Sequence, residues 1–186
     1  MDSKLQIISG VYRGRKLRLP PNARPTQNRA RIALFNMLES GIVDAGADMV
    51  VWDAFAGSGA FGLECVSRYA GASVVFTDVA PTSVKTVRDN LATLNVGARA
   101  TVTQADAISV AQKYAPVADL IFIDAPYDMH ELGVALIKKI GALAKSGAIV
   151  IWEQESINPY QPDESKWQIL RDKTYGRARF LIMQKI

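Results

Sequence analysis

The strongest constraint on the fold of this chain is an alternation between short apolar runs and longer segments with helical spacing. The apolar runs, rich in β-branched residues, lie at 49–53, 72–78, 98–106, 120–124 and 147–155. The helical segments are 28–40, the later part of 54–70, 81–95 and 130–144. Strands that alternate with helices of this length form a mainly parallel sheet with helices on both faces. The sequence therefore predicts the α/β class.

The two ends of the chain depart from this alternation. At the C-terminus, two strand-like runs within 166–186 flank Tyr175-Gly176, which predicts an antiparallel hairpin and brings the sheet to seven strands. At the N-terminus, 5–10 and 11–19 are typical of two short strands, and a proline-rich stretch follows them. We expect one domain over 1–186, with a basic hairpin extension at 1–27 and an α/β core at 28–186.

Composition excludes several classes of protein. The chain has 186 residues, 49% of them hydrophobic, enough for one domain with a sizeable core. Cys65 is the only cysteine, so no intramolecular disulfide can form, as suits a reducing cytoplasm. With His130 as the only histidine, a Cys/His metal site is excluded and no metal is expected. No apolar run approaches the roughly 18 residues that span a bilayer, so we expect a cytoplasmic protein without a membrane partner.

Charge is distributed unevenly along the chain. Residues 1–31 hold eight of the 22 basic residues and one of the 18 acidic residues, whereas the remainder holds 14 basic and 17 acidic residues. A basic N-terminal segment on a mildly acidic body favours a polyanionic partner. The alternative is a solvated basic arm with no partner.

Three acids follow three successive predicted strands. Asp53 closes the first strand, Asp78 closes the second, and Asp106 follows the third. In an open α/β sheet, ligands bind outside the carboxyl ends of the strands, so these acids are candidate ligand-binding groups. Asp106 could equally cap the N-terminus of a helix.

The loop after the first strand narrows the choice of ligand. Its glycines, Gly57, Gly59 and Gly62, form G-x-G-x-x-G between a strand and a helix, which favours a nucleotide-type ligand. In a dinucleotide site the pyrophosphate would lie here, but Asp53 would repel it. The ammonium group of S-adenosylmethionine would instead pair with Asp53, and Asp78 and Asp106 suit its ribose hydroxyls and adenine amino group. The predicted cofactor-binding residues are Asp53, Phe55, Ala56, Gly57, Ser58, Gly59, Asp78, Val79, Asp106 and Ala107.

The tetrapeptide Asp124-Ala125-Pro126-Tyr127 ends the fourth strand with residues that a buried strand does not need. An exocyclic amine on a purine is a poor nucleophile because its lone pair is delocalised into the ring. The Asp124 carboxylate and the Ala125 carbonyl can accept its two hydrogens and turn the lone pair toward a methyl donor. Tyr127 can stack on the extruded base. We expect these four residues to form the catalytic site.

These motifs resemble a known family. "DAFAGSGAFGLE" with "DAPY" looks like the amino-methyltransferases, whose second motif is Asp/Asn-Pro-Pro-aromatic. "RGRKLRLPPNARPTQNRARIALFNML" and "YGRARFLIMQKI" are similar to the bacterial 16S rRNA guanine-N2 methyltransferases of the RsmD family. The resemblance implies a Rossmann-like, S-adenosylmethionine-dependent fold and methylation of guanine N2 in 16S rRNA. It further implies a partly assembled small ribosomal subunit as substrate, and we expect a monomer.

The resemblance also identifies departures and a surface. Ala125 stands where the family usually has proline, Asp78 replaces a more usual glutamate, and Asn28 and Ile32 replace acids. Glu153, at the end of the fifth strand, is a candidate for the far side of the cleft. The predicted RNA-binding residues are Arg13, Arg15, Lys16, Arg24, Thr26, Arg29, Arg31, Arg177 and Arg179.

Three other functions remain compatible with parts of the sequence. The same tetrapeptide serves methylation of DNA adenine N6, although the chain has no room for a separate target-recognition region. A non-catalytic RNA-binding or assembly factor could retain the fold, but the complete set of site acids argues against it. A dehydrogenase that binds NAD is the most distant alternative.

Overall fold

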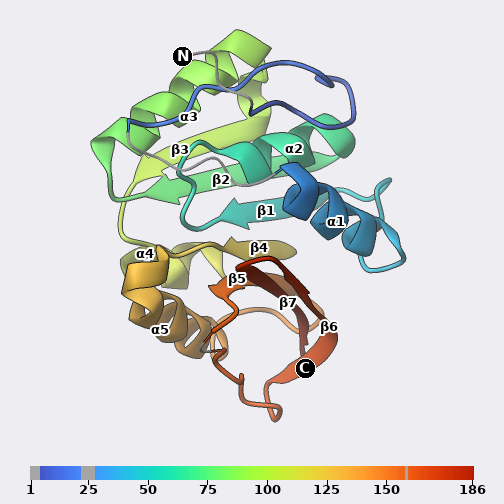
Figure 1. Ribbon diagram of the computed structural model, residues 1–186, viewed down its shortest axis with the longest axis vertical. Coiled ribbons are helices and arrows are strands. Elements are labelled where there is room, and N and C mark those ends of the chain that lie inside the picture. The colour runs from blue at the N-terminus through green and yellow to red at the C-terminus, as the bar shows by residue number, and fades with distance from the viewer. Residues whose placement is uncertain (1–4, 22–27, 158) are drawn as a thin grey trace.

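The computed structural model describes residues 5–21, 28–157 and 159–186. Its strands are β1 (Met49–Asp53), β2 (Ala72–Asp78), β3 (Ala100–Gln104), β4 (Leu120–Ile123), β5 (Ile149–Glu155), β6 (Trp167–Tyr175) and β7 (Ala178–Lys185). They form one seven-stranded sheet in the order β3-β2-β1-β4-β5-β7-β6 (Figure 1). Strands β1 to β5 pair in parallel, and β7 pairs antiparallel with both β5 and β6. The predicted mainly parallel sheet with an antiparallel C-terminal hairpin is confirmed.

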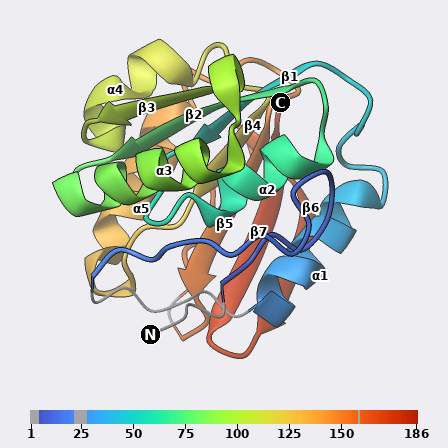
Figure 2. The same cartoon turned by 90° about the horizontal axis from the view of Figure 1, so that it is seen from above.

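Helices cover both faces of this sheet. They are α1 (Asn28–Glu39), α2 (Ala60–Arg68), α3 (Pro81–Leu94), α4 (Ala107–Tyr114) and α5 (His130–Ile140), with short 3₁₀ turns η1 (Gly97–Arg99) and η2 (Tyr127–Met129). Helices α1, α2 and α3 lie over one face, and α4 and α5 lie over the other (Figures 1 and 2). Because side chains alternate along a strand, Val51 packs in the core under α1, α2 and α3, and Trp52 packs in the core under α4 and α5. Among the helices of the described residues, none has the length and apolar character needed to cross a bilayer.

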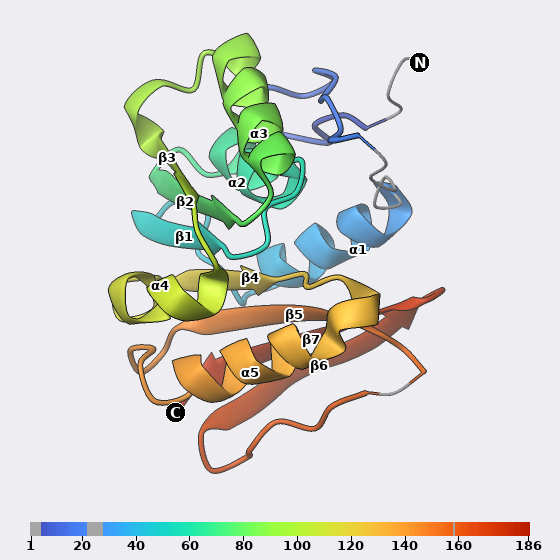
Figure 3. The same cartoon turned by 90° about the vertical axis from the view of Figure 1, so that its left-hand side faces the viewer.

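The N-terminal segment 5–21 differs from its prediction. No strand forms there; Gln6 and Lys16 make a single isolated antiparallel bridge. The segment instead lies beside α2 and α3 (Figure 3). The backbone N–H groups of Ile8 and Ser9 donate to the Glu64 carboxylate of α2, at 2.8 and 2.9 Å. The Ile7 N–H donates to the Arg15 carbonyl at 3.0 Å and the Leu17 N–H to the Leu5 carbonyl at 2.9 Å, so part of the predicted pairing is present without regular strands.

The loop from β1 to α2 brings the first ligand-binding segment to the carboxyl edge of the sheet. Gly57 and Gly59 have φ of 54° and 78°, a left-handed conformation that glycine adopts most easily. Gly62 lies in α2 where a Cβ atom would be 2.4 Å from the Phe76 ring of β2. Glycine at position 62 therefore allows α2 to pack closely on the sheet, which points the start of α2 toward the ends of β1 and β2.

Candidate active site

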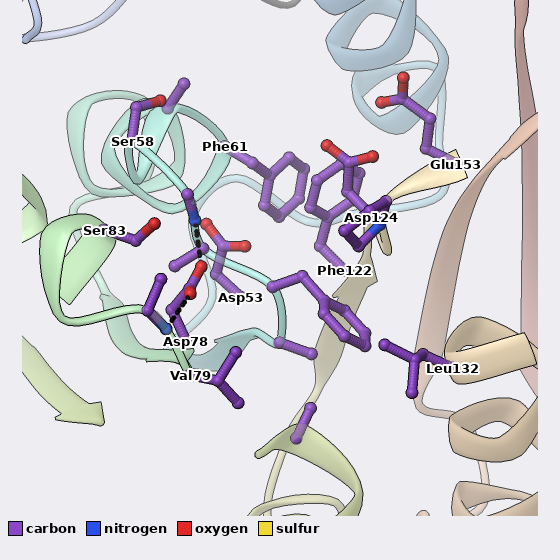
Figure 4. Close-up of a pocket in the computed structure, with 18 of the residues that line it drawn as sticks. Asp53, Ser58, Phe61, Asp78, Val79, Ser83, Phe122, Asp124, Leu132 and Glu153 are labelled. Carbon is purple, nitrogen blue, oxygen red and sulfur yellow. Dashed lines mark hydrogen bonds between the residues drawn. The ribbon is translucent and has the colours of Figure 1, made fainter. Parts of the chain in front are cut away.

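A cavity of about 470 Å³ opens at the carboxyl ends of β1, β2, β4 and β5 (Figure 4). All of the predicted cofactor-binding residues except Gly59 line it. So do Asp124 and Pro126 of the tetrapeptide, and Glu153 at the far side of the cleft. The structure thus brings both predicted motifs, about 70 residues apart in the chain, to one cavity.

Asp78 organises the glycine loop from the end of β2. Its Oδ2 accepts a hydrogen bond from the Gly57 N–H at 2.9 Å, and its Oδ1 accepts one from the Ala80 N–H at 2.9 Å (Figure 4). The carboxylate thereby ties the loop after β1 to the turn before α3. Each oxygen keeps a second lone pair for a ligand hydroxyl.

Asp53 is the most deeply buried acid of the cavity, with 1% of its surface exposed. Its Oδ2 accepts the Gly62 N–H at 3.1 Å. Burial raises the pKa of Asp53 to about 8; the hydrogen bond from Gly62 opposes this rise and the charge of Asp78 adds to it. The other oxygen, Oδ1, has no hydrogen-bond partner among the described residues. A cation placed here would favour the ionised carboxylate.

Asp106 caps a helix and also lines the cavity, so its predicted contact with a cofactor stays a prediction. Its Oδ2 accepts the Ser109 N–H at 2.8 Å and so caps the N-terminus of α4. The same residue lines the cavity, next to Ala105 and Ala107. Val79, 62% exposed, faces the cavity from the end of β2 and offers an apolar contact to a flat ring.

The tetrapeptide divides between the cavity wall and the layer behind it. Asp124 and Pro126 line the cavity, whereas Ala125 is buried behind them. The Tyr127 hydroxyl donates to Glu153 Oε1 at 3.1 Å, and the Arg177 guanidinium lies 5.9 Å from the Tyr127 ring centroid. Neither the N–H nor the carbonyl oxygen of Ala125 has a hydrogen-bond partner among the described residues.

Asp124 and Glu153 make this end of the cavity strongly acidic. The pKa of Asp124 is raised well above its usual range, first by burial and then by the nearby Glu153 and Asp53 carboxyls. Burial raises the pKa of Glu153 to about 7, and its hydrogen bond from Tyr127 opposes the rise. Burial and the Glu153 charge also raise the pKa of Tyr127, which keeps its hydroxyl protonated. No group of metal-ligating side chains occurs in the part of the chain that the structure describes.

Aromatic residues that the sequence did not identify complete the cavity. Phe61 of α2 stacks on Phe122 of β4 with ring centroids 4.0 Å apart, and Phe180 of β7 lines the same side. Ser83 of α3 lies at the opposite end. A continuous apolar strand such as β4 does not reveal which of its side chains faces a ligand. Ser83 follows Asp78 closely in the chain, and this position was the usable sequence signal for a cavity-lining residue.

The predicted RNA-binding residues fall into two groups. Arg13, Arg15, Lys16 and Arg29 are exposed, and Arg177 is exposed and paired with Glu155. Arg24 and Thr26 lie outside the described residues.

Arg31 and Arg179 are buried, with 3% and 5% of their surfaces exposed. Arg31 donates to the Gln6 carbonyl, and Arg179 pairs with both oxygens of Asp172 at 2.8 and 2.7 Å. The Arg179 guanidinium is thereby held inside the protein, whereas Arg31 lines the cavity and its Nε and Nη1 have no hydrogen-bond partner among the described residues. We therefore leave Arg31 and Arg179 out of the RNA-binding surface. The periodicity of α1 could have revealed the first, since Arg31 lies on the same helical face as Leu34, Phe35 and Leu38.

Comparisons with known proteins agree with this architecture. The family described as "Conserved hypothetical protein 95" matches residues 5–184. The Ribosomal RNA small subunit methyltransferase D of Escherichia coli K12 is 39% identical over 190 residues, covering 99% of this chain and 91% of that protein. The protein of the same name from Haemophilus influenzae is 30% identical and covers 97% and 94%. The solved structure of yhhF from Escherichia coli has a TM-score of 0.80 at 34% identity and covers 97% of both chains. Family match, identity and fold extend over nearly the whole length, and the chain therefore belongs to the RsmD family.

Proposed function

We propose that this protein transfers a methyl group from S-adenosylmethionine to the N2 amine of a guanine in 16S rRNA of the small ribosomal subunit. The observation that carries this proposal is the shared cavity, with the glycine loop and its acids at one end and Asp124 at the other. Relatives named as small-subunit rRNA methyltransferases support the substrate class.

The residues present suit the proposed cofactor. Asp53 has a free carboxyl oxygen for an ammonium group, and Asp78 lies where the ribose hydroxyls would bind. Val79 and Ala107 offer apolar contacts to an adenine ring, and Asp106 offers an acceptor for its amino group. When bound, S-adenosylmethionine supplies an activated methyl group on a positively charged sulfur.

The reaction then depends on how the chain holds the amine. Asp124 has no hydrogen-bond partner among the described residues, and the Ala125 carbonyl is likewise available. Together they accept the two N2 hydrogens and orient the nitrogen lone pair toward the methyl group. Such positioning can supply roughly 7–11 kcal/mol of a reaction barrier. The target base must leave its stack to reach this depth.

The basic N-terminal segment completes the proposal by binding the RNA. Arg13, Arg15, Lys16 and Arg29 are exposed and would contact phosphates, with Arg24 and Thr26 as further candidates. We propose that the protein acts as a cytoplasmic monomer on a partly assembled small subunit.

Replacing Asp124 tests this function. We expect Asp124→Ala to reduce methyl transfer by on the order of 100-fold or more, because the amine loses the group that orients it. Affinity for S-adenosylmethionine, measured by calorimetry, should stay within a few-fold of the wild type. Asp124→Asn is the matched control: it keeps an oxygen acceptor, and asparagine occurs at this place in amino-methyltransferases, so turnover should persist at a reduced level.

The assay uses small subunits and free 16S rRNA from cells that lack the gene, with mass spectrometry to locate the transferred methyl group. The proposal expects one N2-methylguanine in wild-type reactions. Full turnover by Asp124→Ala, or a methyl group on adenine, would overturn it.

A further inference from the structure

The acidic end of the cavity holds more carboxylate oxygens than the amine clamp requires. Strand β4 pairs with β5 so that Ile123 lies opposite Trp152. Asp124, directly after β4, and Glu153, within β5, therefore lie at the same level, and both line the cavity. Figure 4 shows the two carboxyl groups on the same side of the site.

Glu153 is held in place by one of its two oxygens. Oε1 accepts the Tyr127 hydroxyl at 3.1 Å, while Oε2 has no hydrogen-bond partner among the described residues. Only 7% of the Glu153 surface is exposed, so the free oxygen faces the cavity rather than bulk water. Buried carboxylates are normally paired or hydrogen-bonded, and an open one in a cavity indicates a ligand with donors.

No cation of the described residues satisfies this need. Arg177 is engaged by Glu155 and lies over the Tyr127 ring. Arg31 also lines the cavity, with its Nε and Nη1 unpartnered, but among the described residues no ion pair joins any cation to Asp124 or Glu153. Among the described residues, the site thus offers three carboxyl oxygens without a hydrogen-bond partner, one on Glu153 and two on Asp124. A matching ligand would present several N–H groups along one edge.

Guanine has such an edge, whereas adenine and cytosine do not. Guanine presents N1–H and the two N2 hydrogens side by side. Adenine presents two hydrogens on N6 beside N1, which is an acceptor, and cytosine likewise presents an amine beside an acceptor. A carboxylate facing N1 of adenine would bring two acceptors together, leaving both without a hydrogen bond.

We infer that Glu153 accepts the N1–H of the target guanine through Oε2, beside the N2 clamp of Asp124 and Ala125, and so determines the choice of base. This inference rests on the proposed function, and it deepens it by assigning a base-reading group. The Tyr127 hydroxyl fixes the Glu153 carboxyl group in the required orientation.

The test compares guanine with 2-aminopurine, which keeps the N2 amine but carries an acceptor at N1. RNA with either base at the target position is prepared by ligation and assembled into small subunits. Wild-type protein should prefer guanine in kcat/KM by on the order of 100-fold or more, because the analogue leaves a buried carboxylate unpaired. Glu153→Gln presents an amide N–H to N1, so the preference should fall to about tenfold or less.

Tyr127→Phe separates base reading from positioning. It removes the hydroxyl that orients Glu153 but keeps the aromatic ring and the Glu153 carboxyl group, so turnover should fall and the preference for guanine should fall less than in Glu153→Gln. If Tyr127→Phe relaxes the preference as much as Glu153→Gln does, Glu153 acts only through the tyrosine and the inference is wrong. A Glu153→Gln protein that retains the wild-type preference also overturns it, as does one whose main defect is a loss of S-adenosylmethionine affinity.

Equilibrium binding of the two RNAs keeps the inference testable if Glu153→Gln has no measurable turnover. The inference expects this variant to bind 2-aminopurine RNA more tightly, relative to guanine RNA, than the wild type does. An unchanged ratio of affinities counts against it. The proposed function fails separately, if the wild-type protein methylates no guanine in the small subunit.

Discussion

At the scale of single residues, Asp53 couples the charge of the cavity to the stability of the fold. Its pKa is about 8 in the native protein, against an ordinary value of 3.8. The native state therefore holds a proton between these pH values that the unfolded chain has released. Its contribution to stability is complete below about pH 4 and is lost as pH rises through about 8. Asp124 and Glu153, whose pKa values are also raised, act in the same direction.

Asp53→Asn should weaken this pH dependence, because an amide stays neutral at every pH. Urea unfolding without cofactor, from pH 5 to 8.5, should show the wild type losing more stability than the variant. One pKa unit corresponds to about 1.4 kcal/mol, so the difference should reach at least that size near pH 8. Equal slopes for the two proteins would show that Asp53 is not protonated in the native state. The same substitution should also weaken S-adenosylmethionine binding at pH 8.

At the scale of elements, the packing of α2 on β2 determines the position of the glycine loop. Gly62→Ala would place a methyl group 2.4 Å from the Phe76 ring, so helix and strand must separate. Overpacking of this kind typically costs about 1–3 kcal/mol. We expect a lower thermal midpoint and weaker S-adenosylmethionine binding. Gly14→Ala, at a position with open space around it, is the control: it should lower stability through its positive φ alone, without changing cofactor affinity.

Local pattern predicted the elements best where they lie inside the sheet. β1 and β2 begin and end at the predicted residues, because continuous apolar runs bounded by acids have few other structures available. Helix α4 was not named from the sequence; it has eight residues and only a short buried face. The predicted N-terminal strands pair only irregularly. Ile7 and Leu17 donate to the carbonyls of Arg15 and Leu5, whereas the N–H groups of Ile8, Ser9 and Tyr12 donate to Glu64 and Ser67 of α2. Such long-range partners leave no local pattern.

The site shows the same division between local and long-range information. Asp53, Asp78, Asp106 and Asp124 follow strands and could be placed at one edge of the sheet from the sequence alone. The free oxygen of Glu153 could not, because it depends on the register between β4 and β5 and on the tyrosine that binds the other oxygen. The burial of Arg179 likewise depends on its pairing with Asp172 across β6 and β7.

At the scale of the whole molecule, the proposed RNA-binding surface is the basic N-terminal segment. Arg13, Arg15 and Lys16 are exposed. They belong to the segment 5–21, which lies beside α2 and α3, whereas α4 and α5 cover the opposite face of the sheet (Figure 3). Binding through phosphates releases counterions and is therefore sensitive to salt.

Replacing these three residues with alanine should weaken RNA binding and flatten its dependence on salt. For single-stranded RNA, the slope of log K against log salt should fall by about 0.7 for each phosphate that the variant no longer neutralises. The control replaces Lys113, Lys138 and Lys173, which are exposed elsewhere and carry the same total charge. Equal effects of the two triple variants would mean that RNA responds to net charge and not to this surface.

The buried side chain of Asn90 connects the basic N-terminal segment to the glycine loop after β1. Asn90 of α3 donates to the carbonyls of both Arg18 and Ser58, at 3.1 and 2.9 Å, and accepts the Arg18 N–H at 2.8 Å. A displacement of either backbone is therefore transmitted to the other through a single amide. If bound RNA raises the affinity for S-adenosylmethionine by some factor, thermodynamic reciprocity requires bound S-adenosylmethionine to raise the affinity for RNA by the same factor. Asn90 is therefore the contact through which RNA binding and cofactor binding would strengthen each other by equal factors.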